Sequence, residues 1–437
     1  MHLSLNSLKA IGHDHLLREL FLKSTFPFVV RIVGVVSNLG FTYLISRILG
    51  ASGAGVFFLS LTVLMVATVL SRAGLDNSVL RLIASAAGGG RWALVACVYR
   101  NSLGIAFCLA LLISLVVYSF SDQIAISIFG EPDMGLPLRW MTLAIVPFSL
   151  LVLQAEAFKA VAATSVAIFL QNTGITLGCF LTLAVLQNST LAAHNVCQIY
   201  GVSCLVVFLG AVYLWRRKVP QHPCQGDDCS ARSLLRVSAP LFWVSVLNLL
   251  MGWMDTIVLG VWHDSSVVGI YGIANRVAAL LGLLLAVVNS VVAPRFSSLF
   301  HEGKLNEIQS LFSRSVYVMI ILGFPVLIIY FLFAEQILNM FGNNFGAAAV
   351  VLKILSAGQF VNIATGSVGY LLMMTGHEKI MRNNIFLACM VNIILNMTLV
   401  PYFGAVGAAT ATAATVISLN LASLYFVKRK LGVSLFG

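Results

Sequence analysis

Two arginines and one aspartate lie in strongly apolar stretches of this sequence, where charged side chains are rare. Arg31, Asp255 and Arg276 each fall within a hydrophobic run long enough to cross a bilayer. A membrane helix tolerates such a charge where it faces a water-filled cavity or a partner, because its cost at the bilayer centre is roughly 2.5 to 3.5 kcal/mol on insertion scales. A guanidinium binds phosphate well, since its planar fork donates two parallel hydrogen bonds. The residues therefore indicate binding of an anionic group, and no catalytic constellation is evident.

Arg276 is the strongest candidate for a substrate-binding residue. It lies about ten residues into its run, which is roughly 15 Å deep at the helical rise of about 1.5 Å per residue. We expect it to line a central cationic cavity. The alternative is an ion pair between helices, for which Asp255 is the nearest acid in sequence.

Asn248 and Asp255 belong to a polar stripe in the preceding run. Its members step by three or four residues and so share one helix face: Ser245, Asn248, Gly252 and Asp255. We expect that face to line the cavity or to contact the other half of the protein. Because Asp255 is near the outer end of its run, a role in charge pairing or gating stays open beside substrate contact.

Arg31 and Asn38 are seven residues apart in the first run and share a helix face as well. We expect both to face the cavity, although Arg31 is close enough to the cytoplasmic end to reach lipid headgroups instead. Arg81 and Arg100 are placed at the cytoplasmic mouth, where they would attract an anionic headgroup. The general excess of cations on that side is the simpler explanation for these two.

The composition is that of an integral membrane protein. Of the 437 residues, 59% are hydrophobic and 9% are charged, against roughly 25% charged in a soluble domain. Long apolar runs rather than ten-residue alternations predict helices, which satisfy their own backbone hydrogen bonds in lipid. The formal charge of +11 does not indicate nucleic-acid binding, because the cations cluster in alternate loops.

Twelve runs reach the length of about 20 residues that a bilayer requires. Their predicted ranges are 26–48, 55–73, 94–120, 136–157, 164–186, 191–214, 234–260, 267–294, 310–333, 347–374, 380–401 and 405–427. Most of the 26 lysines and arginines fall on the side that holds both ends of the chain. The positive-inside rule makes that side, with both termini, cytoplasmic.

The two halves of the sequence repeat. Pro27 corresponds to Pro240, the segment from Gly55 to that from Gly269, and Arg100 to Arg314, all at nearly the same spacing. An even number of spans per half makes the repeats parallel, with a cavity between two six-helix lobes. The expected organisation begins with an N-terminal cytoplasmic or interfacial segment (1–25) and an N lobe (26–214). A cytoplasmic linker (215–233), a C lobe (234–427) and a cytoplasmic tail (428–437) follow.

Three blocks resemble a known family. They are AGLDNSVLRLIA (73–84), DTIVLGVWHDSSVVGIYGIANR (255–276) and NIILNMTLVPYFGAVGAATATAAT (392–415). Together they are similar to the polysaccharide flippases (Wzx-type O-antigen flippases) of the multidrug/oligosaccharidyl-lipid/polysaccharide exporter superfamily. The resemblance implies an all-α membrane protein of the MATE-like fold, whose two lobes rock to carry a lipid-diphosphate-linked oligosaccharide.

The first functional hypothesis is accordingly a flippase for an undecaprenyl-diphosphate-linked glycan in the bacterial inner membrane, serving surface polysaccharide assembly. Its expected partners are that glycan, membrane lipids and a polysaccharide polymerase or chain-length complex, with the protein itself a monomer. No cofactor is expected, since no G-x-x-x-x-G-K motif for ATP is present. Coupling to H⁺, Na⁺ or the membrane potential is left open.

Two other functions fit less well. A MATE-like multidrug antiporter needs intramembrane acids for a cationic drug, whereas the first span holds Arg31 and no acid. A membrane glycan polymerase or ligase needs acid–base groups in a large external domain, and the longest external loop predicted, 121–135, is short. His222, Cys224 and Cys229 have a spacing that zinc can use, but they supply only three ligands in an irregular order, so thiols rather than a metal site are expected.

Overall fold

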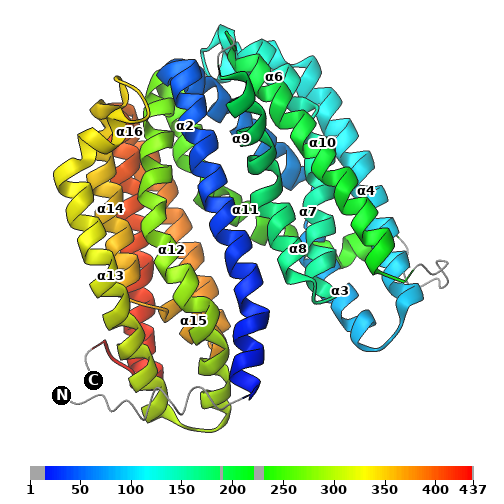
Figure 1. Ribbon diagram of the computed structural model, residues 1–437, viewed down its shortest axis with the longest axis vertical. Helices are drawn as coiled ribbons and strands as arrows, with labels where there is room; N and C mark the ends of the chain where they lie inside the picture. Colours follow the sequence, from blue (N-terminus) through cyan, green and yellow to red (C-terminus); the bar gives the residue numbers. More distant parts are fainter. Residues whose placement is uncertain (1–14, 188–189, 221–230, 436–437) are drawn as a thin grey trace.

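The computed structural model describes residues 15–187, 190–220 and 231–435, and these residues form helices and short turns without a β-strand. The linker cluster of His222, Cys224 and Cys229 and most of the N-terminal segment lie outside the described residues. The helices gather into two bundles that lie side by side (Figure 1). We call α2–α10 the N lobe and α11–α16 the C lobe.

Helix α2 (His15–Arg72) contains the first two spans. Gly50 breaks it with φ 66° and ψ −168°, a conformation that glycine adopts without the steric cost of a Cβ. The chain therefore rises along the molecule, turns at Gly50 and returns toward α3 (Leu75–Gly88) (Figure 1).

The rest of the N lobe consists of single and broken spans. Helix α4 (Trp92–Ser119) crosses in one piece, and α10 (Ala193–Lys218) does the same. A bend of 51° separates the segment 132–142, which includes α6 (Gly135–Thr142), from α7 (Ile145–Ala160). The fifth span consists of α8 (Thr164–Ile168), a π-helical turn η3 (Phe169–Thr173) and α9 (Gly174–Leu186).

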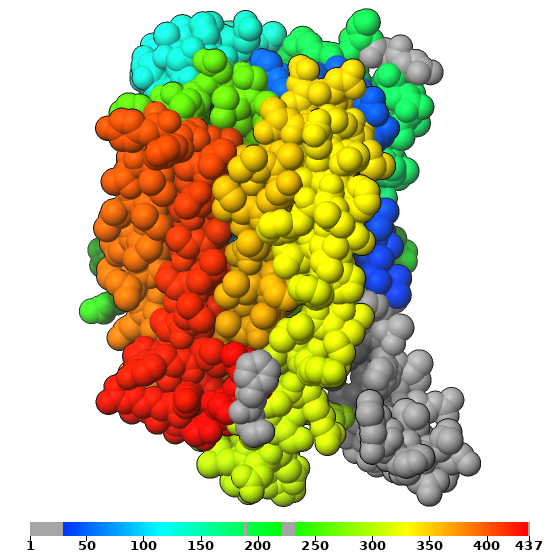
Figure 2. Space-filling model, turned by 90° about the vertical axis from the view of Figure 1, so that its left-hand side faces the viewer, coloured from blue at the N-terminus to red at the C-terminus, as the bar shows by residue number. Residues whose placement is uncertain are grey.

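The C lobe repeats this plan. Its helices are α11 (Ala231–Trp262), α12 (Ser265–His301), α13 (Leu305–Asn339), α14 (Ala349–Ala364), α15 (Val368–Met374) and α16 (Glu378–Leu431). Gly404 (φ 52°) breaks α16 as Gly50 breaks α2, so α16 also contains two spans. Figure 2 shows the outer face of this lobe, which α13, α14 and α16 form. Exposed apolar side chains on α13 and α16 include Tyr317, Leu332 and Phe386.

These breaks account for the twelve predicted spans. In the described part of the chain, nine helices are long and apolar enough to cross a membrane, and the bent pair around α6 and α7 makes ten. Two of the nine contain two spans each, because Gly50 and Gly404 interrupt them. The prediction of an all-α membrane protein with two like lobes is confirmed.

Candidate functional site

A cavity of about 440 Å³ lies between the two lobes. Helices α2, α7, η3, α9 and α10 form one wall, and α11 and α12 form the other. Aromatic side chains alternate in the lining with amides and hydroxyls: Phe58, Phe148, Tyr200, Trp253, Asn38, Asn172, Asn275, Thr42, Thr176 and Thr256. Among the described residues that line it, Arg276 carries the charge and no carboxylate is present. The cavity is therefore polar, aromatic and cationic.

Arg276 is held over the aromatic wall of the N lobe although it belongs to the C lobe. Its guanidinium carbon lies 3.8 Å from the centre of the Phe58 ring, a cation–π contact across the lobe interface. Its Nη1 donates to the Gly272 carbonyl oxygen at 2.9 Å. Gly272 must remain small, since a Cβ there would lie 2.6 Å from the Phe58 ring.

The alternative of an ion pair between Arg276 and Asp255 is not what the structure shows. No salt bridge joins Arg276 to a carboxylate within the described chain, and Asp255 bonds to other groups. Arg276 instead lines the cavity. Its substrate-binding role stays a prediction.

A second pocket of about 330 Å³ continues the cavity between α2 and α12. The two spaces share Asn38, Asn172 and Arg276, and the second one adds Arg31. Arg31 is exposed at its rim, next to apolar side chains of α2 that are exposed as well, such as Ile32 and Val36. The cavity and the second pocket therefore extend toward the lipid-facing side of α2, and Arg276 and Arg31 both line this space.

The amides of Gln171 and Asn172 are cavity residues that the sequence analysis missed. The π-helical turn η3 presents both of them to the cavity, and an extra residue in a turn is often a functional feature. Gly34 of α2 packs tightly on this turn, because a Cβ at Gly34 would lie 2.5 Å from the Thr173 hydroxyl. Two consecutive amides in an otherwise apolar span were the signal that could have revealed them.

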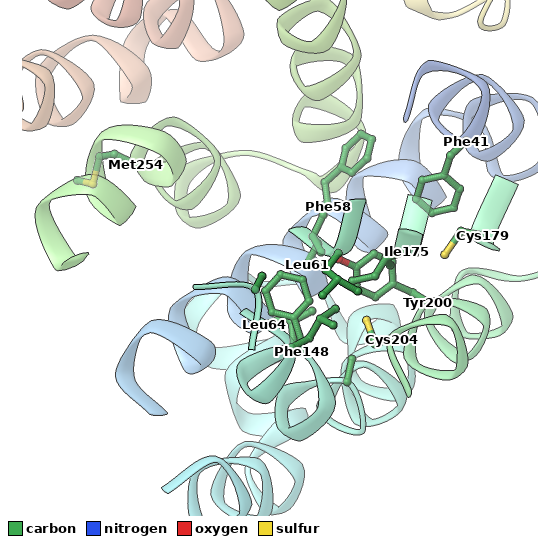
Figure 3. Close-up of a cluster of buried hydrophobic side chains, with 14 of the residues drawn as sticks. Phe41, Phe58, Leu61, Leu64, Phe148, Ile175, Cys179, Tyr200, Cys204 and Met254 are labelled. Atoms are coloured by element: carbon green, nitrogen blue, oxygen red, sulfur yellow. The ribbon is translucent and has the colours of Figure 1, made fainter. Parts of the chain in front are cut away.

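Buried apolar side chains support the N-lobe wall of the cavity. Figure 3 shows Phe41, Phe58 and Leu61 of α2 converging with Phe148 of α7 and Tyr200 of α10. Phe41 packs edge-on against Phe57 at 5.7 Å, and Phe57 packs likewise against Tyr200 at 6.0 Å. Such packing fixes the aromatic faces before a ligand arrives.

Asp255 does not line the cavity. Its carboxylate is buried inside the C lobe, where it accepts hydrogen bonds from the Asn396 amide at 2.8 Å and from the hydroxyls of Tyr271 and Thr412. The expectation that the stripe from Ser245 to Asp255 faces one surface is wrong, since Gly252 lines the cavity while Asp255 points away from it. The stripe has four members over 11 residues, and α11 lies between the cavity and α16, so Gly252 faces the cavity while Asp255 bonds to α16.

Asn248, Arg81 and Arg100 also lie outside the cavity lining. Asn248 is exposed, one helical turn from Gly252 on α11. Arg81 is exposed on α3, and Arg100 lies in a groove on the outer side of the N lobe, between α4 and α10. The structure thus brings together Arg31, Asn38 and Arg276 from the predicted set.

At the end of the molecule where α2 turns, the two lobes are in close contact. A Cβ on Gly55 would lie 1.7 Å from the Ser265 carbonyl oxygen, and one on Gly269 would lie 2.1 Å from the Ala51 carbonyl oxygen. Gly55 and Gly269 are equivalent positions of the internal repeat, so the glycines meet near the axis that relates the lobes. We call this contact the outer gate.

Polar contacts add to the outer gate. The carboxylate of Glu131, in the N lobe, accepts a hydrogen bond from the backbone N–H of Ser265, at the first turn of α12. Such a carboxylate also interacts favourably with the helix dipole. Nearby, Nε of Arg47 donates to the Met340 carbonyl oxygen at 2.9 Å.

The opposite end of the interface is closed between α3 and α11. The Ser238 hydroxyl donates to the Ser78 hydroxyl at 2.8 Å, and a Cβ on Gly74 would lie 2.5 Å from the Phe242 nitrogen. The lobes therefore touch at both of these places, and the second pocket, between α2 and α12, adjoins the cavity.

Two like lobes, multiple membrane spans and a polar cavity between the lobes define a membrane transporter. The fold agrees with the solved structure titled "Lipid II flippase MurJ, inward closed conformation", with a TM-score of 0.70 at 15% sequence identity over 93% of this chain and 87% of that one.

The sequence comparisons then give the family. Residues 17–300 match the family described as "Polysaccharide biosynthesis protein", and residues 240–398 match MatE. The chain belongs to the polysaccharide biosynthesis protein family, as its three motif blocks predict. It is 27% identical to the "Probable low-salt glycan biosynthesis flippase Agl15" of Haloferax volcanii over 88% of this chain and 79% of that protein. It is 32% identical to the "Probable flippase AglR" of the same organism over 40% of this chain, a match that spans 37% of AglR.

Proposed function

We propose that this protein is a flippase that moves a lipid-diphosphate-linked oligosaccharide across a membrane during glycan assembly. The observation that carries the proposal is Arg276, held in a cavity between two like lobes whose described lining has no carboxylate. The names of Agl15 and AglR and the fold shared with MurJ support it. These relatives are named as flippases, which sets the glycan polymerase or ligase alternative aside.

In this proposal each part of the cavity takes one part of the substrate. The diphosphate binds Arg276 through bidentate hydrogen bonds and passes Arg31 on its way in from the lipid side. Sugar rings stack on aromatic faces such as Phe148 and Trp253, and the amides of Gln171 and Asn172 bind hydroxyls. The lipid tail stays in the bilayer, beyond the second pocket between α2 and α12.

Transport requires the outer gate to open. We infer that the lobes rock about their interface, so that the contacts at Gly55 and Gly269 part while those at the other end tighten. This alternating access keeps the polar headgroup away from acyl chains throughout.

The proposed carrier lipid is undecaprenyl diphosphate in the bacterial inner membrane, with both termini cytoplasmic and the polymer an O-antigen, capsule or exopolysaccharide. The distribution of lysine and arginine supports this orientation, and α2 begins and α16 ends at the same end of the molecule (Figure 1). A negative-inside potential favours outward movement of the anionic diphosphate by about 2.3 kcal/mol per charge per 100 mV. The cavity is complete within one chain, which supports a monomer as the working unit.

We further propose that a monovalent cation, H⁺ or Na⁺, couples to transport at Asp255. Its carboxylate is surrounded by oxygen-bearing side chains, and the Oδ1 atoms of Asn392 and Asn396 are buried without a donor among the described residues. A carboxylate with amide and hydroxyl oxygens suits a hard cation, and protonation would equally neutralise it. The site lies next to α12, which carries Arg276, so its occupancy can bias the lobe that binds substrate.

A multidrug antiporter is the alternative that the MatE match raises. A cationic drug would meet Arg276 in a cavity whose described lining has no acid to offset it. Flipping and drug export are separated by a complementation experiment in a strain lacking this gene. The wild type should restore surface glycan without changing drug susceptibility, whereas Arg276→Ala should insert normally and restore little glycan. Normal surface glycan with Arg276→Ala would refute the assignment.

A further inference from the structure

A groove of about 360 Å³ lies on the outer side of the N lobe, well apart from the transport cavity. Its walls are the first turns of α4 and the last turns of α10, which are the outer helices of that lobe (Figure 1). Tyr99 of α4 stacks on Trp215 of α10 at 4.3 Å, and Phe158 of α7 packs edge-on against Trp215 at 5.1 Å. The floor is thereby rigid and aromatic.

Two arginines, one from each wall, line this groove. Arg100 of α4 and Arg216 of α10 are both exposed, and neither is in an ion pair or hydrogen bond with the described residues. The next arginine differs, since Arg217 lies over the Tyr213 ring at 4.9 Å and is not part of the groove. Two guanidiniums that the described residues leave unpaired offer charge-assisted hydrogen bonds to an anion placed between them.

The same groove has apolar walls on its lipid side. Leu103 of α4 and Val212 of α10 continue it toward the membrane interior. An apolar stretch follows Arg100 to the end of α4, and another apolar stretch precedes Arg216 and fills most of α10. Both arginines therefore lie at the same edge of the bilayer. Positive-inside bias explains the presence of cations at this edge, but not a pocket that gathers them over an aromatic floor.

A pocket between α12 and α13 of the C lobe has a different lining. It contains Arg314, the repeat partner of Arg100, and Arg295, but Glu307 also lines it. A carboxylate there offsets the positive charge. The described lining of the N-lobe groove thus combines two arginines with no acid, as the second pocket of the transport cavity does with Arg31 and Arg276.

We propose that this groove is a binding site for an anionic phospholipid of the leaflet at that edge. The headgroup phosphate lies between Arg100 and Arg216, and an acyl chain lies along Leu103 and Val212. Basic pockets between membrane helices on the cytoplasmic side are suited to such headgroups. The site is independent of the proposed substrate path, because none of its residues lines the transport cavity.

Lipid binding to the purified full-length protein tests this proposal by native mass spectrometry and thermal shift. Phosphatidylglycerol should bind and stabilise the wild type, whereas phosphatidylcholine should do so much less. Arg100→Gln/Arg216→Gln should weaken phosphatidylglycerol binding about tenfold, which is about 1.4 kcal/mol. The matched control Arg81→Gln/Arg217→Gln removes the same charge outside the groove and should bind within twofold of the wild type.

Two results would overturn the proposal. An equal loss in the control pair would mean diffuse attraction to a basic surface. Equal stabilisation by inorganic phosphate in lipid-free detergent would mean a soluble anion site. If the double variant fails to fold, Ala96→Trp fills the half-buried groove without changing charge. That variant should also lose phosphatidylglycerol binding, and retained binding would count against the groove.

Discussion

The outer gate leaves no room for a side chain, so a single methyl group should open it. A Cβ at position 55 would lie 1.7 Å from the Ser265 carbonyl oxygen, whereas Cβ atoms essentially never come within 3.0 Å of another atom. The obstacle is backbone and cannot rotate away. In Gly55→Ala the facing helices must therefore separate by more than an ångström. The substitution destabilises the state in which the gate is closed and leaves the open state unaffected.

The size of the effect follows from the cost of overpacking. Inserting a methyl group into a tight contact costs roughly 1 to 3 kcal/mol. At about 1.4 kcal/mol per factor of ten, the ratio of open to closed gate should rise roughly 5- to 150-fold. Gly269→Ala should act in the same direction, since its Cβ would lie 2.1 Å from the Ala51 carbonyl oxygen.

Electron-electron double resonance can measure this shift. Spin labels on p-acetylphenylalanine at Leu136 and Tyr402, both exposed and in different lobes, avoid the native cysteines. Gly55→Ala should move the distance distribution to longer values, and Gly210→Ala should not, because no atom lies within 4 Å of a Cβ there. An unchanged distribution in a correctly folded Gly55→Ala protein would refute the gate and the rocking motion inferred from it.

Three further predictions concern single side chains. Glu131→Gln should weaken the charge-assisted hydrogen bond to Ser265 and destabilise the closed gate by roughly 1 kcal/mol. In the same spin-label experiment its shift should be smaller than that of Gly55→Ala, and a larger shift would contradict the steric account. In proteoliposomes, Asp255→Asn should abolish the dependence of transport on a Na⁺ or pH gradient while lipid-diphosphate binding persists. If transport still depends on the gradient, Asp255 is not the coupling site. Asn172→Ala should lower glycan transport severalfold with little loss of thermal stability, because its side chain is exposed to the cavity; unchanged transport would remove the amide from the sugar site.

The helices and the two-lobe plan could be predicted from the sequence because both depend on local composition. Apolar length gives the spans, and the spacing of equivalent residues such as Gly55 and Gly269 gives the repeat. The breaks at Gly50 and Gly404 were expected only as turns, since a glycine in an apolar run does not reveal whether the helix ends there or bends.

The site was predictable only in part. Arg276 was evident because charge at mid-membrane is costly and therefore informative. The orientation of the Asp255 side chain could not be predicted. It depends on the rotation of α11, which can point the carboxylate either to the cavity or to Asn396 and Thr412 of α16. Likewise the π-helical turn that exposes Asn172 has no sequence signature beyond two adjacent amides.

Binding of a lipid diphosphate to Arg276 is the central claim, and a titration of the purified protein with undecaprenyl diphosphate tests it most directly. Undecaprenyl monophosphate serves as the weaker ligand, and Arg276→Gln and Arg276→Lys are compared with the wild type. The account predicts that the wild type prefers the diphosphate, that Arg276→Gln weakens its binding about 10- to 100-fold, and that Arg276→Lys recovers only part of the loss because lysine lacks the bidentate fork. Equal diphosphate affinity in the wild type and Arg276→Gln would contradict it.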